Sequence, residues 1–151
     1  MSDIRIDTEI DISAPTARVW EVLTDLPSYG DWNPMIRSAS GVVGAGARLT
    51  LHFKPEGQRG HIFRPKLLVV EPGRELRWLG SPRFPGVVDS QHYFLLSGNS
   101  EGATHLVHGT VFYGILIPLI GRKLEASTRV PFTDMNKALK NRCETGVPQP
   151  E

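Results

Sequence analysis

The segment Ile115–Cys143, with the sequence ILIPLIGRKLEASTRVPFTDMNKALKNRC, predicts the longest element of the chain. Its apolar and small residues recur at steps of three and four, which is the spacing of one face of an α-helix. That predicted face comprises Leu116, Ile120, Leu124, Ser127, Pro131, Met135 and Ala138. At ~1.5 Å per residue the helix is about 40 Å long, and because mostly strands precede it, we expect its apolar face to lie on a sheet.

The middle of this predicted helix leaves space beneath it. Small side chains stand at Ala126, Ser127 and Thr128, where a tightly packed helix would carry Leu or Phe. Pro131 lacks an N–H inside the pattern and is expected to kink the axis. Because close-packed interiors rarely leave unused space, we expect a cavity between helix and sheet. The alternative is that a Phe or Trp from the sheet fills it.

Composition limits the possible partners. The 151 residues are 40% hydrophobic, which is enough for the core of one domain. The 17 basic and 16 acidic residues leave a formal net charge of +1, so we expect no nucleic-acid partner. The longest apolar run, Ile115–Ile120, contains Pro118 and is too short to cross a bilayer, so we expect no stable membrane insertion.

The chain ends and the cysteine content favour a cytoplasmic protein. The segment Met1–Arg5 lacks the apolar region of a signal peptide. The single cysteine, Cys143, cannot form an internal disulfide. Residues 146–151, GVPQPE, predict a disordered tail. We expect a monomer or a weak homodimer.

Strands make up most of the chain before the long helix. Residues Ile4–Ile12 alternate between apolar and polar side chains, as in a strand with one solvent-facing side. Two short helices follow, one beginning near Pro15 and one at Pro27–Trp32. Six further strands are predicted at Ile36–Val43, Ala47–Phe53, Gly60–Val70, Glu75–Leu79, Val87–Leu96 and Thr104–Tyr113. Pro65 lies inside the third of these, which is expected to be bulged or at an edge.

This order of elements predicts how the strands pair. Successive strands with short turns form an antiparallel meander, and a strongly twisted sheet of seven strands curves around what lies on its concave face. The first strand, separated from the others by the short helices, can pair with the last. The long helix is the element available to occupy the concave face.

Short motifs along nearly the whole chain resemble one known superfamily. They are ISAP at Ile12–Pro15, Val19–Trp20, YGDWNP at Tyr29–Pro34, EPGRELRW at Glu71–Trp78, HYF at His92–Phe94, GAT at Gly102–Thr104 and His108–Gly109. With the long helix, they resemble the helix-grip fold of the START-related (SRPBCC) superfamily, which includes pollen-allergen-type proteins and the polyketide cyclase/dehydrase and lipid-transport group. Many relatives carry an acidic residue after the His-Gly pair, where this chain has Thr110.

The resemblance implies an α+β helix-grip fold. In this fold a seven-stranded curved antiparallel sheet, two short helices and a long C-terminal helix enclose a cavity. We expect a single domain of this kind over residues 1–145. The resemblance also implies a hydrophobic small-molecule ligand.

Strand parity indicates which side chains face the expected cavity. If Phe94 points inward, so does His92 on the same strand. On the following strand the same rule turns His108 and Thr110 inward. In the proline-rich loop 81–86, Phe84 is a candidate gate beside the first turn of the helix. The expected ligand-binding residues are Trp78, His92, Phe94, His108, Thr110, Phe112, Phe84, Ser127, Thr128 and Pro131.

Three functions are compatible with this pattern. The first is binding of a lipid, polyketide or aromatic compound, because apolar walls with a few converging polar groups are typical of small-molecule sites. The second is a cyclase/dehydrase-type enzyme in which His92 or His108 is the general base and Thr110 orients the substrate. The third is a protein–protein module with a filled core. As a structural alternative, both histidines hydrogen-bond to each other or to the backbone.

The sequence predicts neither a metal site nor a cofactor site. His105 and His108 are three residues apart, which places them on opposite faces of a strand. His52 and His61 lie on separate strands with no cysteine nearby. The glycine-rich segment Gly41–Gly46 precedes no helix that could hold a phosphate, so we interpret it as a hairpin turn.

Overall fold

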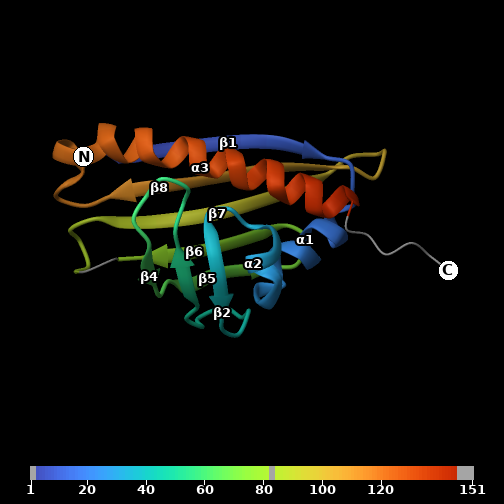
Figure 1. Ribbon diagram of the computed structural model, residues 1–151, viewed down its shortest axis with the longest axis horizontal. Coiled ribbons are helices and arrows are strands. Elements are labelled where there is room, and N and C mark those ends of the chain that lie inside the picture. The colour runs from blue at the N-terminus through green and yellow to red at the C-terminus, as the bar shows by residue number, and fades with distance from the viewer. Residues whose placement is uncertain (1–2, 82–83, 146–151) are drawn as a thin grey trace.

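A long C-terminal helix runs the length of the molecule beside antiparallel strands in the computed structural model, which describes residues 3–81 and 84–145 (Figure 1). The strands are β1 Ile4–Ile12, β2 Ile36–Ser40, β3 Thr50–Phe53, β4 His61–Phe63, β5 Lys66–Glu71, β6 Glu75–Gly80, β7 Asp89–Gly98 and β8 Thr104–Tyr113. The helices are α1 Thr16–Thr24, the 3-10 helix η1 Leu26–Ser28, α2 Tyr29–Trp32 and α3 Ile117–Thr145. The expected α+β helix-grip class is confirmed. The predicted tail, 146–151, lies outside the described residues.

The strands form two sheets rather than one. Five strands pair in the order β1-β8-β7-β6-β5, and three pair in the order β2-β3-β4. The expected pairing of the first strand with the last is confirmed by the register Ile4↔Phe112 to Ile12↔Thr104. The two sheets are joined by main-chain hydrogen bonds from Leu49 N to Pro65 O and from Leu67 N to Ala47 O.

The prediction of seven strands was wrong, because the predicted strand Gly60–Val70 is divided. Its two parts are β4 and β5, which belong to different sheets, and Pro65 lies between them. A proline has no N–H to donate to a neighbouring strand, so pairing is interrupted where it occurs. The interruption lets β4 turn away from β5, so the structure has eight strands in the part of the chain it describes.

Helix α3 packs against β1 and β8 through a face rotated from the predicted one. Leu116 precedes the helix and is exposed, whereas Ile117 is buried as its first residue. The buried residues of α3 are Ile117, Gly121, Thr128, Pro131, Phe132, Met135, Asn136, Leu139 and Cys143. Gly121 explains the rotation, because a Cβ at this position would overlap the side chain of Ile4 on β1. At Gly121 the helix therefore approaches β1 too closely for a residue with a Cβ.

Gly114 makes the sharp turn from β8 into α3. Its φ of 131° lies in a region that residues with a Cβ rarely adopt. A Cβ there would also overlap the carbonyl of Val87. The next two amides, of Ile115 and Leu116, donate to the carbonyls of Gly86 and Val87. The loop before β7 is therefore held against the start of α3.

The hydrophobic core occupies the part of the interior next to α1. Its largest fully buried side chains include Tyr29, Trp78 and Phe94, and Met135 and Leu139 of α3 belong to the same cluster. Large side chains from the sheet and from α2 thus pack in one cluster with the C-terminal half of α3.

Candidate functional site: a cavity beneath the long helix

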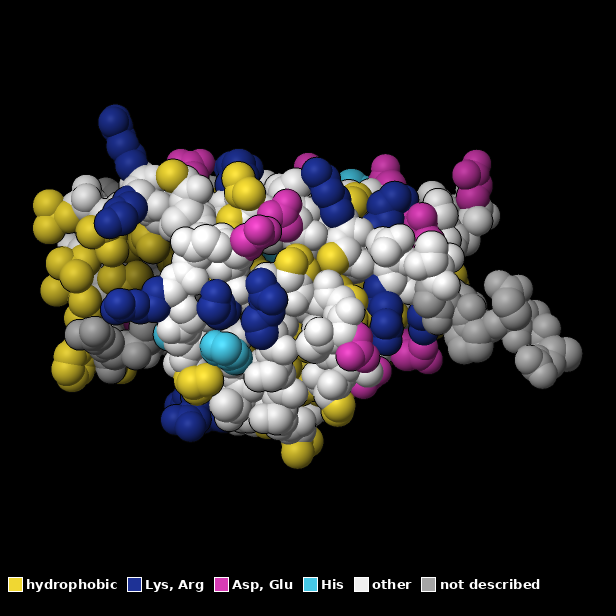
Figure 2. All heavy atoms as spheres, in the orientation of Figure 1, with side chains coloured by type: hydrophobic (Ala, Val, Ile, Leu, Met, Phe, Trp, Pro, Cys, Tyr) yellow, Lys and Arg dark blue, Asp and Glu magenta, His cyan; other side chains and the backbone are white. Residues whose placement is uncertain are grey.

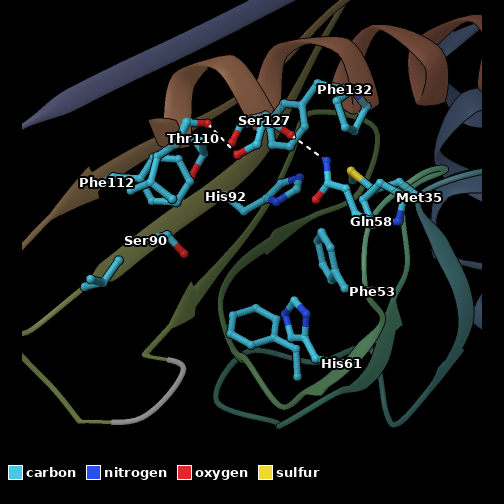
Figure 3. Close-up of a pocket in the computed structure, with 16 residues that line it drawn as sticks. Met35, Phe53, Gln58, His61, Ser90, His92, Thr110, Phe112, Ser127 and Phe132 are labelled. Atoms are coloured by element: carbon cyan, nitrogen blue, oxygen red, sulfur yellow. Dashed lines mark hydrogen bonds between the residues drawn. The ribbon is translucent and has the colours of Figure 1, made fainter. Parts of the chain in front are cut away.

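A cavity of about 230 Å³ lies between α3 and the strands of both sheets (Figure 3). It is lined by Met35, Phe53, Pro55, Gln58, His61, Phe63, Val88, Ser90, His92, Thr110, Phe112, Leu124, Ser127, Thr128, Pro131 and Phe132. Most of these side chains are apolar. Gln58, His61 and Ser127 are exposed, so they form its rim.

A few polar side chains converge on this apolar space. His92 on β7 and Thr110 on β8 are directly opposite each other in the strand register, and both are buried. Ser90 stands two residues before His92 on the same face of β7 and also lines the cavity. Thr128 lines it from α3.

The structure brings six of the ten predicted ligand-binding residues to the cavity wall. They are His92, Thr110, Phe112, Ser127, Thr128 and Pro131. Trp78, Phe94 and His108 are on the predicted inner face but are buried outside the lining. The reason is their depth, because the rings of Trp78 and Phe94 pack against His92, with centroid separations of 4.6 and 5.1 Å.

Phe84 is the fourth predicted residue that does not line the cavity. Its side chain is 68% exposed. The adjoining loop is next to the start of α3, as expected, through the bond from Ile115 N to Gly86 O. Figure 2 shows hydrophobic side chains gathered at the end of the molecule that carries the start of α3, where Ile115 and Leu119 are also exposed. The ring of Phe84 is therefore part of the outer surface.

Four buried polar side chains form a chain of hydrogen bonds behind the cavity. His92 Nε2 is 2.7 Å from His108 Nε2, and His108 Nδ1 is 2.7 Å from Asn136 Oδ1. Asn136 Nδ2 donates to Thr8 Oγ1 over 2.8 Å, and Thr8 Oγ1 donates to the main-chain carbonyl of His108 over 2.7 Å. The two histidines therefore hydrogen-bond to each other, as the structural alternative predicted. His92 also lines the cavity, as the ligand-binding interpretation predicted.

Both histidines are held in the neutral form. Burial, together with the neighbouring His108, lowers the pKa of His92 well below its usual range. Burial also lowers the pKa of His108 to about 3, although its bond to Asn136 acts in the opposite direction. The ring of Phe132 stacks on His108, with 4.0 Å between centroids and an interplanar angle of 7°. The Phe132 ring lines the cavity, which explains why His108 lies behind the wall.

Sequence reasoning missed the contribution of the small sheet. Phe53, His61 and Phe63 line the cavity from β3 and β4, and the rings of Phe53 and His61 stack with centroids 5.9 Å apart. Because the prediction takes Gly60–Val70 as one strand, its parity could not place His61 and Phe63. Asn136 was also missed, although a polar residue four positions after Phe132, on the buried face of α3, was a signal that could have found it.

A loop residue closes the rim against α3. Gln58, between β3 and β4, donates from Nε2 to the main-chain carbonyl of Ser127 over 3.0 Å, as the dashed line in Figure 3 shows. In an α-helix that carbonyl would accept from the N–H of residue 131. Pro131 has no N–H, so the carbonyl is available to Gln58.

The described residues hold neither a metal-binding cluster nor a membrane-spanning helix. They contain no cluster of three or more His, Cys, Asp or Glu side chains that could hold a metal ion. Among the same residues, none of the helices is both long enough and apolar enough to cross a membrane.

Several solved structures have a fold similar to that of this chain. The solved structure of the Zhui aromatase/cyclase from Streptomyces sp. R1128 is 21% identical, covers 97% of both chains and has a TM-score of 0.79. A START superfamily protein from Mycobacterium smegmatis is 16% identical, with 95% of this chain and 99% of that chain covered and a TM-score of 0.76. Norcoclaurine synthase from Thalictrum flavum, in complex with dopamine and hydroxybenzaldehyde, is 13% identical, with coverage of 98% and 90% and a TM-score of 0.72.

These structural likenesses are all below 25% identity and concern the fold. A search of curated proteins found no match. A family model gives the stronger result, because it matches residues 3–144, nearly the whole chain. The chain therefore belongs to the polyketide cyclase/dehydrase and lipid transport family.

Proposed function

We propose that this protein binds a small, mainly apolar ligand with one polar end in the cavity beneath α3. The observation that carries the proposal is the composition of the wall, in which the aromatic rings of Phe53, Phe63 and Phe112 line the same cavity as the polar side chains of His92 and Thr110. Burial of apolar ligand surface supplies affinity at such sites, and a few polar groups set the orientation.

The size of the cavity limits the ligand. Pockets for drug-sized ligands commonly measure ~300–1,000 Å³. The volume of about 230 Å³ is smaller, which favours a compact ring system over a long lipid chain. The membership in a polyketide cyclase/dehydrase and lipid transport family supports binding or conversion of such compounds in general.

Ligand capture and cavity filling test the proposal together. We expect native mass spectrometry of protein purified from cells to show a bound small molecule. We also expect Ser90→Leu to weaken binding of the aromatic probe 2-naphthol at least tenfold, because the added side chain projects into the cavity. Ser97→Leu is the matched control, since Ser97 is exposed on the same strand. Equal affinity for 2-naphthol in both variants would contradict the proposal.

A second candidate is an enzyme of the cyclase/dehydrase kind with His92 as its general base. Two observations favour it: His92 lines the cavity as a neutral imidazole, and the aromatase/cyclase from Streptomyces sp. R1128 has a similar fold. The lowered pKa of His92 argues for weak basicity, so the base would need a substrate with an acidic proton. Thr110, opposite His92, would then orient that substrate.

The two candidates differ in what loss of His92 does. For an enzyme, His92→Gln should abolish turnover of a cyclisable polyketide and leave binding within severalfold of the original. For a binding protein, no turnover is expected from either form. Thr110→Val separates orientation from binding, because it keeps the volume of the side chain and removes the hydroxyl.

A further inference from the structure

We propose that Thr8 and Asn136 fix the protonation pattern of the two histidines so that His92 presents an unprotonated Nδ1 to the cavity. The site then selects apolar ligands that carry a hydroxyl donor over ligands that offer only an acceptor. This inference rests on the proposed binding function and specifies the ligand that the cavity takes.

The direction of the hydrogen bonds begins at a main-chain carbonyl. The carbonyl of His108 can only accept, so the Thr8 hydroxyl bonded to it over 2.7 Å must donate its single proton there. Thr8 Oγ1 can therefore only accept in its other bond, which comes from Asn136 over 2.8 Å. The Asn136 amide consequently has its NH₂ group towards Thr8.

The orientation of Asn136 then determines both tautomers. With its NH₂ group towards Thr8, Asn136 presents Oδ1 to His108 at 2.7 Å, and His108 Nδ1 must carry the proton. Neutral His108 therefore has a lone pair on Nε2. His92 Nε2, 2.7 Å away, must donate to it. Neutral His92 is left with a lone pair on Nδ1.

The remaining nitrogen of His92 is open to the cavity. Among the described residues, no hydrogen bond involves His92 Nδ1. The buried side-chain atoms without a partner in this part of the chain are Arg18 Nε, Trp32 Nε1, Asn33 Nδ2 and Trp78 Nε1. His92 Nδ1 has no partner and is not one of these buried atoms, so it is not fully buried. His92 lines the cavity, which is therefore the space that Nδ1 faces. Figure 3 shows the ring at the centre of the lining residues.

A fixed acceptor discriminates between ligands, whereas a hydroxyl does not. The hydroxyls of Ser90 and Thr110 can turn to donate or accept, so they tolerate either kind of polar group. The lone pair of His92 Nδ1 can only accept. A ligand hydroxyl pairs with it, while a ligand ether or carbonyl leaves two desolvated acceptors facing each other.

The protonation pattern can be measured without a ligand. Two-dimensional ¹⁵N–¹H spectra that correlate ring nitrogens with ring protons distinguish the two neutral tautomers of histidine. We expect His92 to be protonated on Nε2 and His108 on Nδ1 at neutral pH. Protonation of His92 on Nδ1, or averaging between tautomers, would overturn the inference whatever the protein binds.

The selectivity is tested with 2-naphthol and 2-methoxynaphthalene. We expect the wild-type protein to prefer 2-naphthol by about tenfold, the ratio that one additional hydrogen bond supplies. In Thr8→Val the Asn136 amide loses its orienting acceptor and can turn over, so the preference should fall severalfold. Thr8→Ser keeps the hydroxyl and should keep the preference. The difference in size between the probes cancels when the same pair is compared across variants.

The possible outcomes separate this inference from the proposed function. If neither probe binds to the wild-type protein, the proposed function fails. The NMR spectra of the two histidines still test the hydrogen-bond chain in that case, because they need no ligand. If both probes bind equally well, the protein is a ligand binder and the selectivity is refuted. If Thr8→Val keeps the wild-type preference, Thr8 is not a positioning residue.

Discussion

Gln58 Nε2 donates a 3.0 Å hydrogen bond to the main-chain carbonyl of Ser127, four residues before a proline inside α3. The two residues are 69 positions apart in the sequence. Because Pro131 has no N–H, this carbonyl lacks its helical partner, and the loop between β3 and β4 supplies one. The bond links the small sheet to the long helix at the rim of the cavity.

Loss of this bond should free the loop between β3 and β4. In Gln58→Ala we expect the amides of residues 54–60 to exchange hydrogen faster, with a loss of less than about 1 kcal/mol in the free energy of unfolding because the bond is exposed. Hydrogen-exchange mass spectrometry measures the change. Ser127→Ala is the control, since it keeps the carbonyl and should leave exchange unchanged. If these amides exchange as slowly in Gln58→Ala as in the wild-type protein, the bond does not hold the loop.

Replacement of the proline should have opposite effects on helix and loop. In Pro131→Ala the new N–H can bond to the Ser127 carbonyl, which restores the helical hydrogen bond and removes an unfavourable residue. We expect the free energy of unfolding to rise by about 1–3 kcal/mol, while residues 54–60 exchange faster because Gln58 loses its acceptor. Thermal unfolding and hydrogen exchange test both parts. A destabilised protein with a protected loop would refute this account of Pro131.

Gly80 should be required for the contact between the two sheets. A Cβ at Gly80 of β6 would overlap the ring of Phe63, which lines the cavity from β4. We expect Gly80→Ala to cost about 1–3 kcal/mol of unfolding free energy, as overpacking typically does, and to weaken 2-naphthol binding. Gly98→Ala, at the end of β7, is the matched control because a Cβ there makes only ordinary contacts. Urea unfolding that does not distinguish the two variants would contradict the prediction.

Acid should destabilise the protein through the buried histidines. The pKa of His108 is lowered to about 3 and that of His92 lies well below its usual range, while in the unfolded chain both are near ~6.5. Below that pH the unfolded state binds more protons than the folded state, so stability falls as pH falls. Between pH 7 and pH 5 we expect His108 to account for a loss of about 2 kcal/mol in the free energy of unfolding, and His92 to add a loss of the same sign.

Urea unfolding at several pH values measures this loss. The control is His105→Gln, because His105 is exposed and pairs with Asp11 and Glu9. Those carboxylates raise the pKa of His105, so protonation of His105 stabilises the folded protein as the pH falls. Removal of His105 should therefore leave the acid destabilisation in place. A flat profile between pH 7 and pH 5 would mean that the buried histidines titrate normally.

Much of the fold could be predicted because its signals are local. The alternation in Ile4–Ile12 and the glycine turns of the later strands predicted the antiparallel order, and β1 does pair with β8. The start of α3 was predicted to within two residues. Pro65 was recognised as an irregularity, but a residue pattern cannot say whether a proline bends a strand or divides it between two sheets.

The sequence by itself determined which side chains point inward, because side-chain direction alternates along each strand. His92, His108 and Thr110 all lie on the predicted inner face. The tertiary structure decided which of them reach the cavity, since that depends on how closely α3 approaches. Phe132 stacks on His108 and separates it from the cavity, leaving His92 at the wall. The partners Asn136 and Gln58 come from segments far apart in the chain, and only folding brings their hydrogen-bonding groups together.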